Sequence, residues 1–158
     1  MSAAAIALGF LGAIFHPQRD LQIERYNTNG WRVEVKQDRF TGHNHCTAKA
    51  PAMTYDRGVV TFYFSSNTDT ANALFKPDDG PLRPAGEVAV EAAGLGANFS
   101  SQNLQNPSNG EVHIPSSYLM KAKIIAIRPD ENASHREFKL TGLSDMISTL
   151  RDHGCTEN

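Results

Sequence analysis

The C-terminal block, residues 122–155, constrains the fold most, because its apolar residues change from a strand period to a helix period within one short stretch. Residues 123–128 form a run rich in isoleucine, which is typical of a short strand, and Pro129 ends it because proline has no N–H for a sheet. In residues 136–140 apolar and charged side chains alternate, which indicates a strand with one face in solvent. The block therefore predicts a strand, a turn, a second strand and then a helix.

The residues after Gly142 predict an amphipathic helix. Its apolar residues recur at i, i+3, i+4 and i+7, which places them on one face: Leu143, Met146, Ile147 and Leu150. We expect Thr141 or Ser144 to cap the start of this helix and Gly154 to end it in the left-handed conformation. Cys155 then lies just beyond the helix, close to the domain.

Short β-prone runs bounded by turn residues occupy much of the remaining chain from residue 21 onwards. Strands are expected at residues 31–36, 44–48, 59–64, 73–76 and 111–114. Less regular parts are a strand or helical turn at 87–93, a polar surface loop at 98–110 and a helical turn at 115–120. Many short strands with turns between them predict a mainly β fold, a β-sandwich with the terminal helix packed on it.

The N-terminal segment, residues 1–20, is expected to be separate from a single β-sandwich domain, residues 21–158. Residues 2–15 carry no charge but are short for a membrane span, which needs roughly 20 apolar residues. The length suits the apolar part of a signal peptide, yet no basic residue precedes it and no A-x-A site follows. We instead expect a retained helix.

Small residues recur at four-residue spacing in this segment, at Ala5, Gly9 and Ala13. Such a face permits close packing against a transmembrane helix, although alanine and glycine are common in any apolar segment. The residues expected to contact a partner or the membrane are Ala5, Gly9, Phe10, Ala13 and Ile14.

The charge balance excludes one class of partner. The formal net charge is −2, the isoelectric point is near 6.3, and no run of lysine or arginine occurs. These values argue against a nucleic-acid partner. The two cysteines, Cys46 and Cys155, would be free thiols in a reducing compartment and paired in an exported protein.

Two polar clusters invite a metal-site interpretation, and each has a simpler one. His43 and His45 beside Cys46 offer too few ligands for a structural zinc site, so a polar strand face is the simpler interpretation. Residues 78–80 lack the alternating oxygen ligands of a calcium loop, and a turn between two prolines explains them.

Two further patterns resemble catalytic or phosphate-binding motifs only superficially. Residues 94–98 are glycine-rich but lack the lysine and the βαβ setting of a phosphate loop. Ser116 and Ser117 follow His113 without a nucleophile elbow, and we expect them to cap a helical turn. We therefore predict no enzyme activity, no catalytic residues, no metal and no cofactor.

Several positions together resemble the invasion-associated locus B family of exported alphaproteobacterial proteins. They are Trp31 at the start of an early strand, Cys46 shortly after it, and the ending FKLTGLSDMISTLRDHGC at residues 138–155. The resemblance implies an immunoglobulin-like β-sandwich, export to the periplasm, and no known catalytic residues to carry over. Members of that family carry a conventional cleavable signal, from which residues 1–20 depart.

These observations lead to one expected function and two alternatives. We expect a non-enzymatic accessory subunit, anchored by its N-terminal helix to an integral membrane protein complex on the periplasmic side of the bacterial inner membrane. The first alternative is a soluble periplasmic or surface-associated factor of the locus B type. The second is an enzyme or metal protein that uses His43 and His45. For an exported chain we predict a Cys46–Cys155 disulfide, the alternative being two buried reduced thiols.

Overall fold

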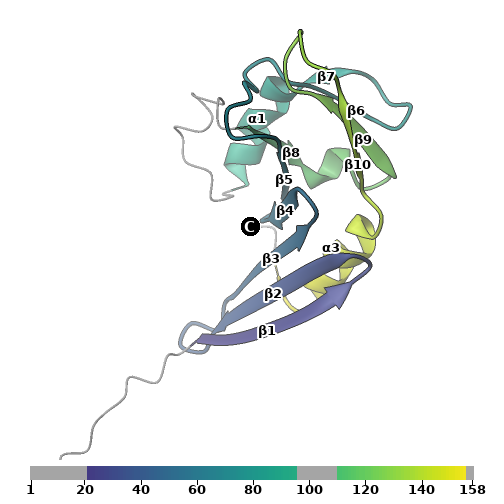
Figure 1. Cartoon of the computed structure of the whole chain (residues 1–158). Helices are drawn as coiled ribbons and strands as arrows, with labels where there is room; N and C mark the ends of the chain where they lie inside the picture. Colours follow the sequence, from purple (N-terminus) through teal and green to yellow (C-terminus); the bar gives the residue numbers. More distant parts are fainter. Residues whose placement is uncertain (1–20, 96–109, 156–158) are drawn as a thin grey trace, which may run out of the picture.

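The computed structural model describes residues 21–95 and 110–155 and shows a mainly β fold built from two antiparallel sheets (Figure 1). Sheet A contains, in spatial order, β1 (Leu21–Thr28), β2 (Trp31–Asp38), β3 (Asn44–Ala50), β4 (Met53–Asp56), β5 (Val59–Tyr63) and β8 (Glu111–Pro115). Sheet B contains, in spatial order, β10 (Arg136–Lys139), β9 (Ile124–Arg128), β6 (Leu74–Pro77) and β7 (Arg83–Pro84). The helices are α1 (Ala85–Gly94), the 3-10 turn η1 (Ser116–Tyr118) and α3 (Leu143–Asp152).

Sheet A is a meander over its first five strands, because each of these strands pairs with the next one in the chain. In immunoglobulin domains the chain instead crosses from one sheet to the other after every one or two strands. The first hairpin of sheet A turns at Asn29 and Gly30, whose φ angles of 46° and 87° are both left-handed. Such a two-residue turn matches the right-handed twist of the strands and fixes the register, in which Thr28 faces Trp31.

The inner face of sheet A is covered by two different partners. At its β5 end it packs against sheet B, where the rings of Phe62 and Phe138 meet edge to face with centroids 5.0 Å apart. At its β1–β3 end it packs against the α3 region, where Trp31 Nε1 donates to the carbonyl oxygen of Thr141 at 3.2 Å. Both sheets and α3 therefore contribute to one hydrophobic core.

The apolar face predicted for the C-terminal helix is confirmed. Leu143, Met146, Ile147 and Leu150 are all buried in α3, and Gly154 ends the helix with a φ of 72°. The expected cap is wrong, however, because neither Thr141 nor Ser144 caps the helix through its side chain. Gly142 occupies the N-cap position in the left-handed conformation, and Asp145 lies in the first turn.

Several elements differ from the sequence-based expectations. Residues 21–28, 53–56 and 83–84 form β1, β4 and β7, and none of the three was expected as a strand. The ambiguous stretch at 87–93 belongs to a helix, α1, which begins after Pro84. The expected strand at 73–76 is β6, which lies one residue further along. The serines of η1 do not cap it through their side chains, so that expectation was also wrong.

Candidate functional site

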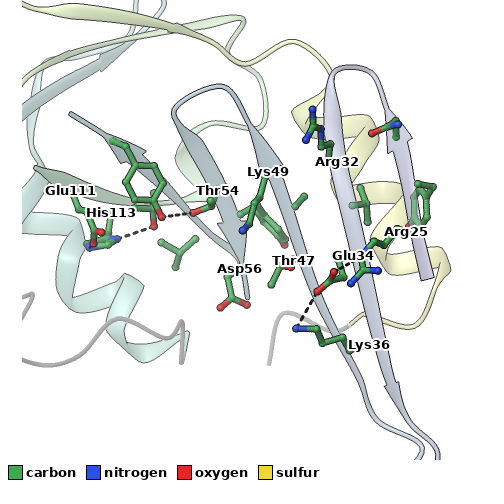
Figure 2. Close-up of a pocket in the computed structure, with 18 residues that line it drawn as sticks. Arg25, Arg32, Glu34, Lys36, Thr47, Lys49, Thr54, Asp56, Glu111 and His113 are labelled. Carbon is green, nitrogen blue, oxygen red and sulfur yellow. Dashed lines mark hydrogen bonds and ion pairs between the residues drawn. The ribbon is translucent and has the colours of Figure 1, made fainter. Parts of the chain in front are cut away.

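The face of sheet A that points away from the core is polar and hollowed, with a cavity of about 710 Å³ (Figure 2). Strand alternation produces this face, because each inward apolar residue is followed by an outward polar one. On β2, for example, Val33 and Val35 are buried, whereas Arg32, Glu34 and Lys36 point outward. We call this hollowed face the polar trough, and most of its outward side chains form two rows across the sheet.

The first row, which we call the acidic row, contains two carboxylates. By register it crosses the strands through Arg25, Glu34, Thr47, Asp56 and Val59. Glu34 accepts from two cations, Lys36 Nζ at 3.0 Å and Arg25 Nε at 2.6 Å. The hydrogen bonds from Lys36 and then Arg25 lower the pKa of the Glu34 carboxyl below its usual value. The Glu34 carboxyl is thus ionised, and the two neighbouring cations compensate its negative charge.

The second row, which we call the cationic row, contains no carboxylate. By register it crosses the strands through Asn27, Arg32, Lys49, Thr54, Thr61 and His113. Arg32 and Lys49 face each other across β2 and β3, and among the described residues neither pairs with a carboxylate. Figure 2 shows Arg32, Lys49 and Thr54 towards one end of the strands, and Glu34, Lys36 and Asp56 towards the other.

Towards β8 the cationic row carries the hydroxyl groups of Thr54 and Thr61, and the hydroxyl group of Tyr63 lies beside the row. Thr54 Oγ1 and Tyr63 Oη lie 3.0 Å apart, and Thr61 Oγ1 lies 2.9 Å from His113 Nδ1. Each hydroxyl can both donate and accept, so these groups keep hydrogen-bonding capacity beyond the bonds they make with each other. The cationic row therefore carries positive charge on β2 and β3 and neutral polar groups on β4, β5 and β8.

His113 closes the cationic row as a neutral side chain. It is 9% exposed, and burial lowers its pKa to about 4. Its Nε2 lies 3.5 Å from Glu111 Oε2, a distance that would suit an ion pair if the imidazole were protonated. Burial outweighs the neighbouring carboxylate, so at neutral pH this contact joins a neutral imidazole to Glu111.

The disulfide lies on the opposite, inner face of sheet A. Cys46 on β3 is bonded to Cys155, which follows α3, and their Cα atoms are 5.8 Å apart across a separation of 109 residues. The predicted pairing is confirmed. A second contact supports the same junction, since Asn44 Nδ2 donates to the carbonyl oxygen of His153 at 2.6 Å.

The histidines near Cys46 are not assembled into a metal site in the described part of the chain. Cys46 is occupied by the disulfide, and His43 precedes β3 while His45 lies on it. His45 Nε2 is 3.9 Å from Asp56 Oδ1. Over residues 21–95 and 110–155, no three His, Cys, Asp or Glu side chains lie close enough together to hold a metal ion.

Asp78, Ser117 and His113 have structural roles, whereas residues 96–98 of the glycine-rich stretch lie outside the described residues. Asp78 accepts from the backbone N–H groups of Lys123 and Ile124 at 2.9 and 2.8 Å, and these bonds lower the pKa of its carboxyl. It thereby joins the turn after β6 to β9, as expected of a turn rather than a calcium loop. Ser117 Oγ contacts Glu91 of α1 at 3.4 Å, while the His113 ring contacts Thr61 of β5.

Three large apolar side chains are exposed at one end of sheet A, and we call these three residues the apolar tip. They are Leu21 (53% exposed) and Ile23 (44%) at the start of β1, and Phe40 (86%) in the turn between β2 and β3. Arg39 Nη2 donates to Gln22 Oε1 at 3.0 Å and ties this turn to β1. Figure 1 shows that β1 begins at this end of the sheet.

The N-terminal contact residues expected from the sequence lie outside the described residues. They are Ala5, Gly9, Phe10, Ala13 and Ile14. Among the residues that the structure does describe, no helix has the length and apolar character needed to cross a membrane. Comparisons of the chain with protein-family models, with curated proteins and with solved structures each found no match.

The polar trough was missed by sequence reasoning. The alternation in residues 31–36 indicates that Arg32, Glu34 and Lys36 face solvent, and this signal was available. The two rows, however, depend on which residues of neighbouring strands lie opposite each other. That register follows from the turns and from how the buried faces of neighbouring strands align, which no single strand shows.

Proposed function

We propose that this protein is a non-enzymatic accessory subunit of an integral membrane protein complex, held on the periplasmic side of the bacterial inner membrane by residues 1–20. Its two sheets form a β-sandwich that rests on the periplasmic face of that complex. The meander of sheet A gives this sandwich a different strand order from an immunoglobulin domain.

The apolar tip is the observation that carries this proposal. Exposed apolar side chains occur singly on most soluble proteins, whereas a contiguous group marks a contact with another protein or a membrane. Leu21, Ile23 and Phe40 are exposed at the end of the sheet where β1 begins, and the uncharged stretch of residues 2–15 precedes this end in the sequence. In the proposed arrangement the tip faces the membrane complex, and the polar trough remains in the periplasm.

The disulfide supports the proposed periplasmic location. Disulfides form and persist in exported proteins and are rare in reducing compartments. The Cys46–Cys155 bond is buried, with both cysteines 7% exposed, and it joins the first half of sheet A to the C-terminal helix. A periplasmic location is consistent with a structural bond of this kind.

One observation favours the second candidate, a soluble periplasmic or surface factor of the locus B type. The residues that carry the resemblance lie together in the fold. Trp31 Nε1 donates a hydrogen bond to the Thr141 carbonyl oxygen, and Cys46 forms a disulfide with Cys155. Fractionation separates the two candidates. An anchored subunit stays with membranes after a high-salt wash, whereas a soluble factor is released.

The partner contact is tested by changing the small face of the N-terminal segment. Replacing Gly9 and Ala13 by leucine keeps the segment apolar but blocks close helix packing, so this variant should remain in the membrane and lose its complex on copurification. Ala3→Leu with Ala7→Leu is the matched control, because these residues lie on the opposite side of a helix. Copurification of the Gly9/Ala13 variant at the parent level would contradict the proposed contact.

A further inference from the structure

We propose that the polar trough binds an acidic saccharide, with an anionic group of the sugar between Arg32 and Lys49 and its hydroxyl groups along the cationic row. This inference goes beyond the proposed accessory role and does not depend on membrane anchoring. It gives the outward face of sheet A a ligand of its own.

The first argument is the pair of like charges. Arg32 on β2 and Lys49 on β3 are direct cross-strand partners, and both are exposed on the same face. Like charges in this relationship destabilise a sheet. An anion bound between the two side chains turns the repulsion into attraction, and a guanidinium group can hold a carboxylate through two hydrogen bonds.

The second argument is the distribution of charge in the trough. Four basic and three acidic side chains line it, so its net charge is +1 with neutral histidine, against −2 for the whole chain. Glu34 is neutralised by Arg25 and Lys36, and Asp56 lies in the other row. Glu111, the third carboxylate, lies beside His113 at the β8 end of the trough. Among the described residues, Arg32 and Lys49 are therefore the basic side chains of the trough that contact no carboxylate.

The third argument is the row of neutral polar groups beside this pair. Thr54, Tyr63 and Thr61 present hydroxyl groups, and His113 ends the row as a neutral imidazole. Sugar hydroxyls both donate and accept, and these side chains can do the same. A simple anion needs only the two cations, whereas an acidic saccharide uses the whole row.

The fourth argument is the shape of the site. The hollow has a volume of about 710 Å³, within the range of about 300–1,000 Å³ that small-molecule sites occupy. Its row crosses six strands, which at about 4.8 Å per strand corresponds to roughly 24 Å. An elongated ligand of several sugar rings suits a row of this length.

The test uses the full chain with its disulfide intact, in detergent, and measures binding by calorimetry at fixed ionic strength. The probes are trigalacturonate, the neutral maltotriose, inorganic phosphate and a triglutamate peptide. We expect trigalacturonate to bind at least tenfold more tightly than each of the other three. Equal binding of phosphate, of the peptide or of maltotriose would overturn the proposal, as would the absence of trigalacturonate binding.

Matched variants locate the ligand. Arg32→Gln with Lys49→Gln should weaken trigalacturonate binding at least tenfold, and Thr54→Val should weaken it without affecting phosphate. Lys121→Gln with Lys139→Gln changes the net charge equally at exposed positions outside the trough and should leave the affinity unchanged. Equal losses in the trough variant and this control would show a general charge effect and overturn the proposed site. Thermal melting confirms that each variant is folded.

Discussion

Gly142 lies against the backbone of Asn29, so closely that a Cβ at Gly142 would stand 2.6 Å from the Asn29 carbonyl oxygen. Gly142 precedes α3, and Asn29 forms the turn between β1 and β2. A side-chain bond strengthens the junction, since Asn29 Nδ2 donates to Asp145 Oδ2 at 2.8 Å. The contact fixes the C-terminal helix on the end of the first hairpin.

Gly142→Ala should therefore destabilise the protein strongly. Its φ of 76° favours glycine, and the added methyl group would overlap Asn29. We expect a loss of roughly 2–5 kcal/mol in the free energy of unfolding, measured by urea denaturation. Gly86→Ala in α1 is the control, because nothing lies within 4 Å of a Cβ there, and it should be neutral or slightly stabilising. Similar midpoints for both variants would contradict the close contact.

Loss of the disulfide should cost about 3–5 kcal/mol, because the bond closes a long loop in the unfolded chain. The two cysteines are 109 residues apart in the sequence. Cys46→Ala with Cys155→Ala should lower the urea midpoint, and dithiothreitol should lower the midpoint of the parent towards that of the variant. The reductant should have no effect on the variant itself. Two alkylatable thiols in the parent before reduction would disprove the bond.

Truncation of the buried face of α3 should create a cavity. Ile147 is fully buried, so Ile147→Ala should lower the free energy of unfolding by about 2–5 kcal/mol. Ser148→Ala, at the next and exposed position, should change it by no more than about 0.5 kcal/mol. If Ile147→Ala melts like Ser148→Ala, α3 does not pack on the core as described.

Burial of His113 should make stability depend on pH. Its pKa is about 4 in the folded protein and near 6.5 in the unfolded chain, so between these values only the unfolded chain binds the proton. The free energy of unfolding should be unaffected by this group above pH 6.5 and fall by about 3 kcal/mol as the pH drops from 6.5 to about 4. His113→Gln should remove this part of the slope. Parallel curves for parent and variant in urea at pH 7, 6, 5 and 4 would contradict a buried neutral histidine.

The sequence predicted those parts of the fold in which one face is buried. Residues 31–36 alternate because Trp31, Val33 and Val35 enter the core, and α3 shows its apolar face for the same reason. The disulfide could be predicted because the chain has two cysteines and the helix brings Cys155 back to the domain.

The sequence contains only weak signals for the remaining strands and for the cationic row. β1 has no buried residue and lies at the edge of sheet A, and the alternation of apolar and polar residues at 21–24 does not continue to the end of the strand. β4 is only four residues long, too short for a periodic pattern. The cationic row could not be predicted because it joins six strands through their registers, and Arg32 and Lys49 meet only once β2 and β3 are aligned.

The most direct test of the account is the location of the native protein in bacterial spheroplasts. After a high-salt wash the protein should stay with the membrane fraction, and protease added to intact spheroplasts should digest it, because the proposal places the domain on the periplasmic side. A cytoplasmic marker protein must stay intact in the same sample. Recovery of the chain in the soluble fraction, or its protection until the spheroplasts are lysed, would contradict a subunit anchored on the periplasmic face of the inner membrane.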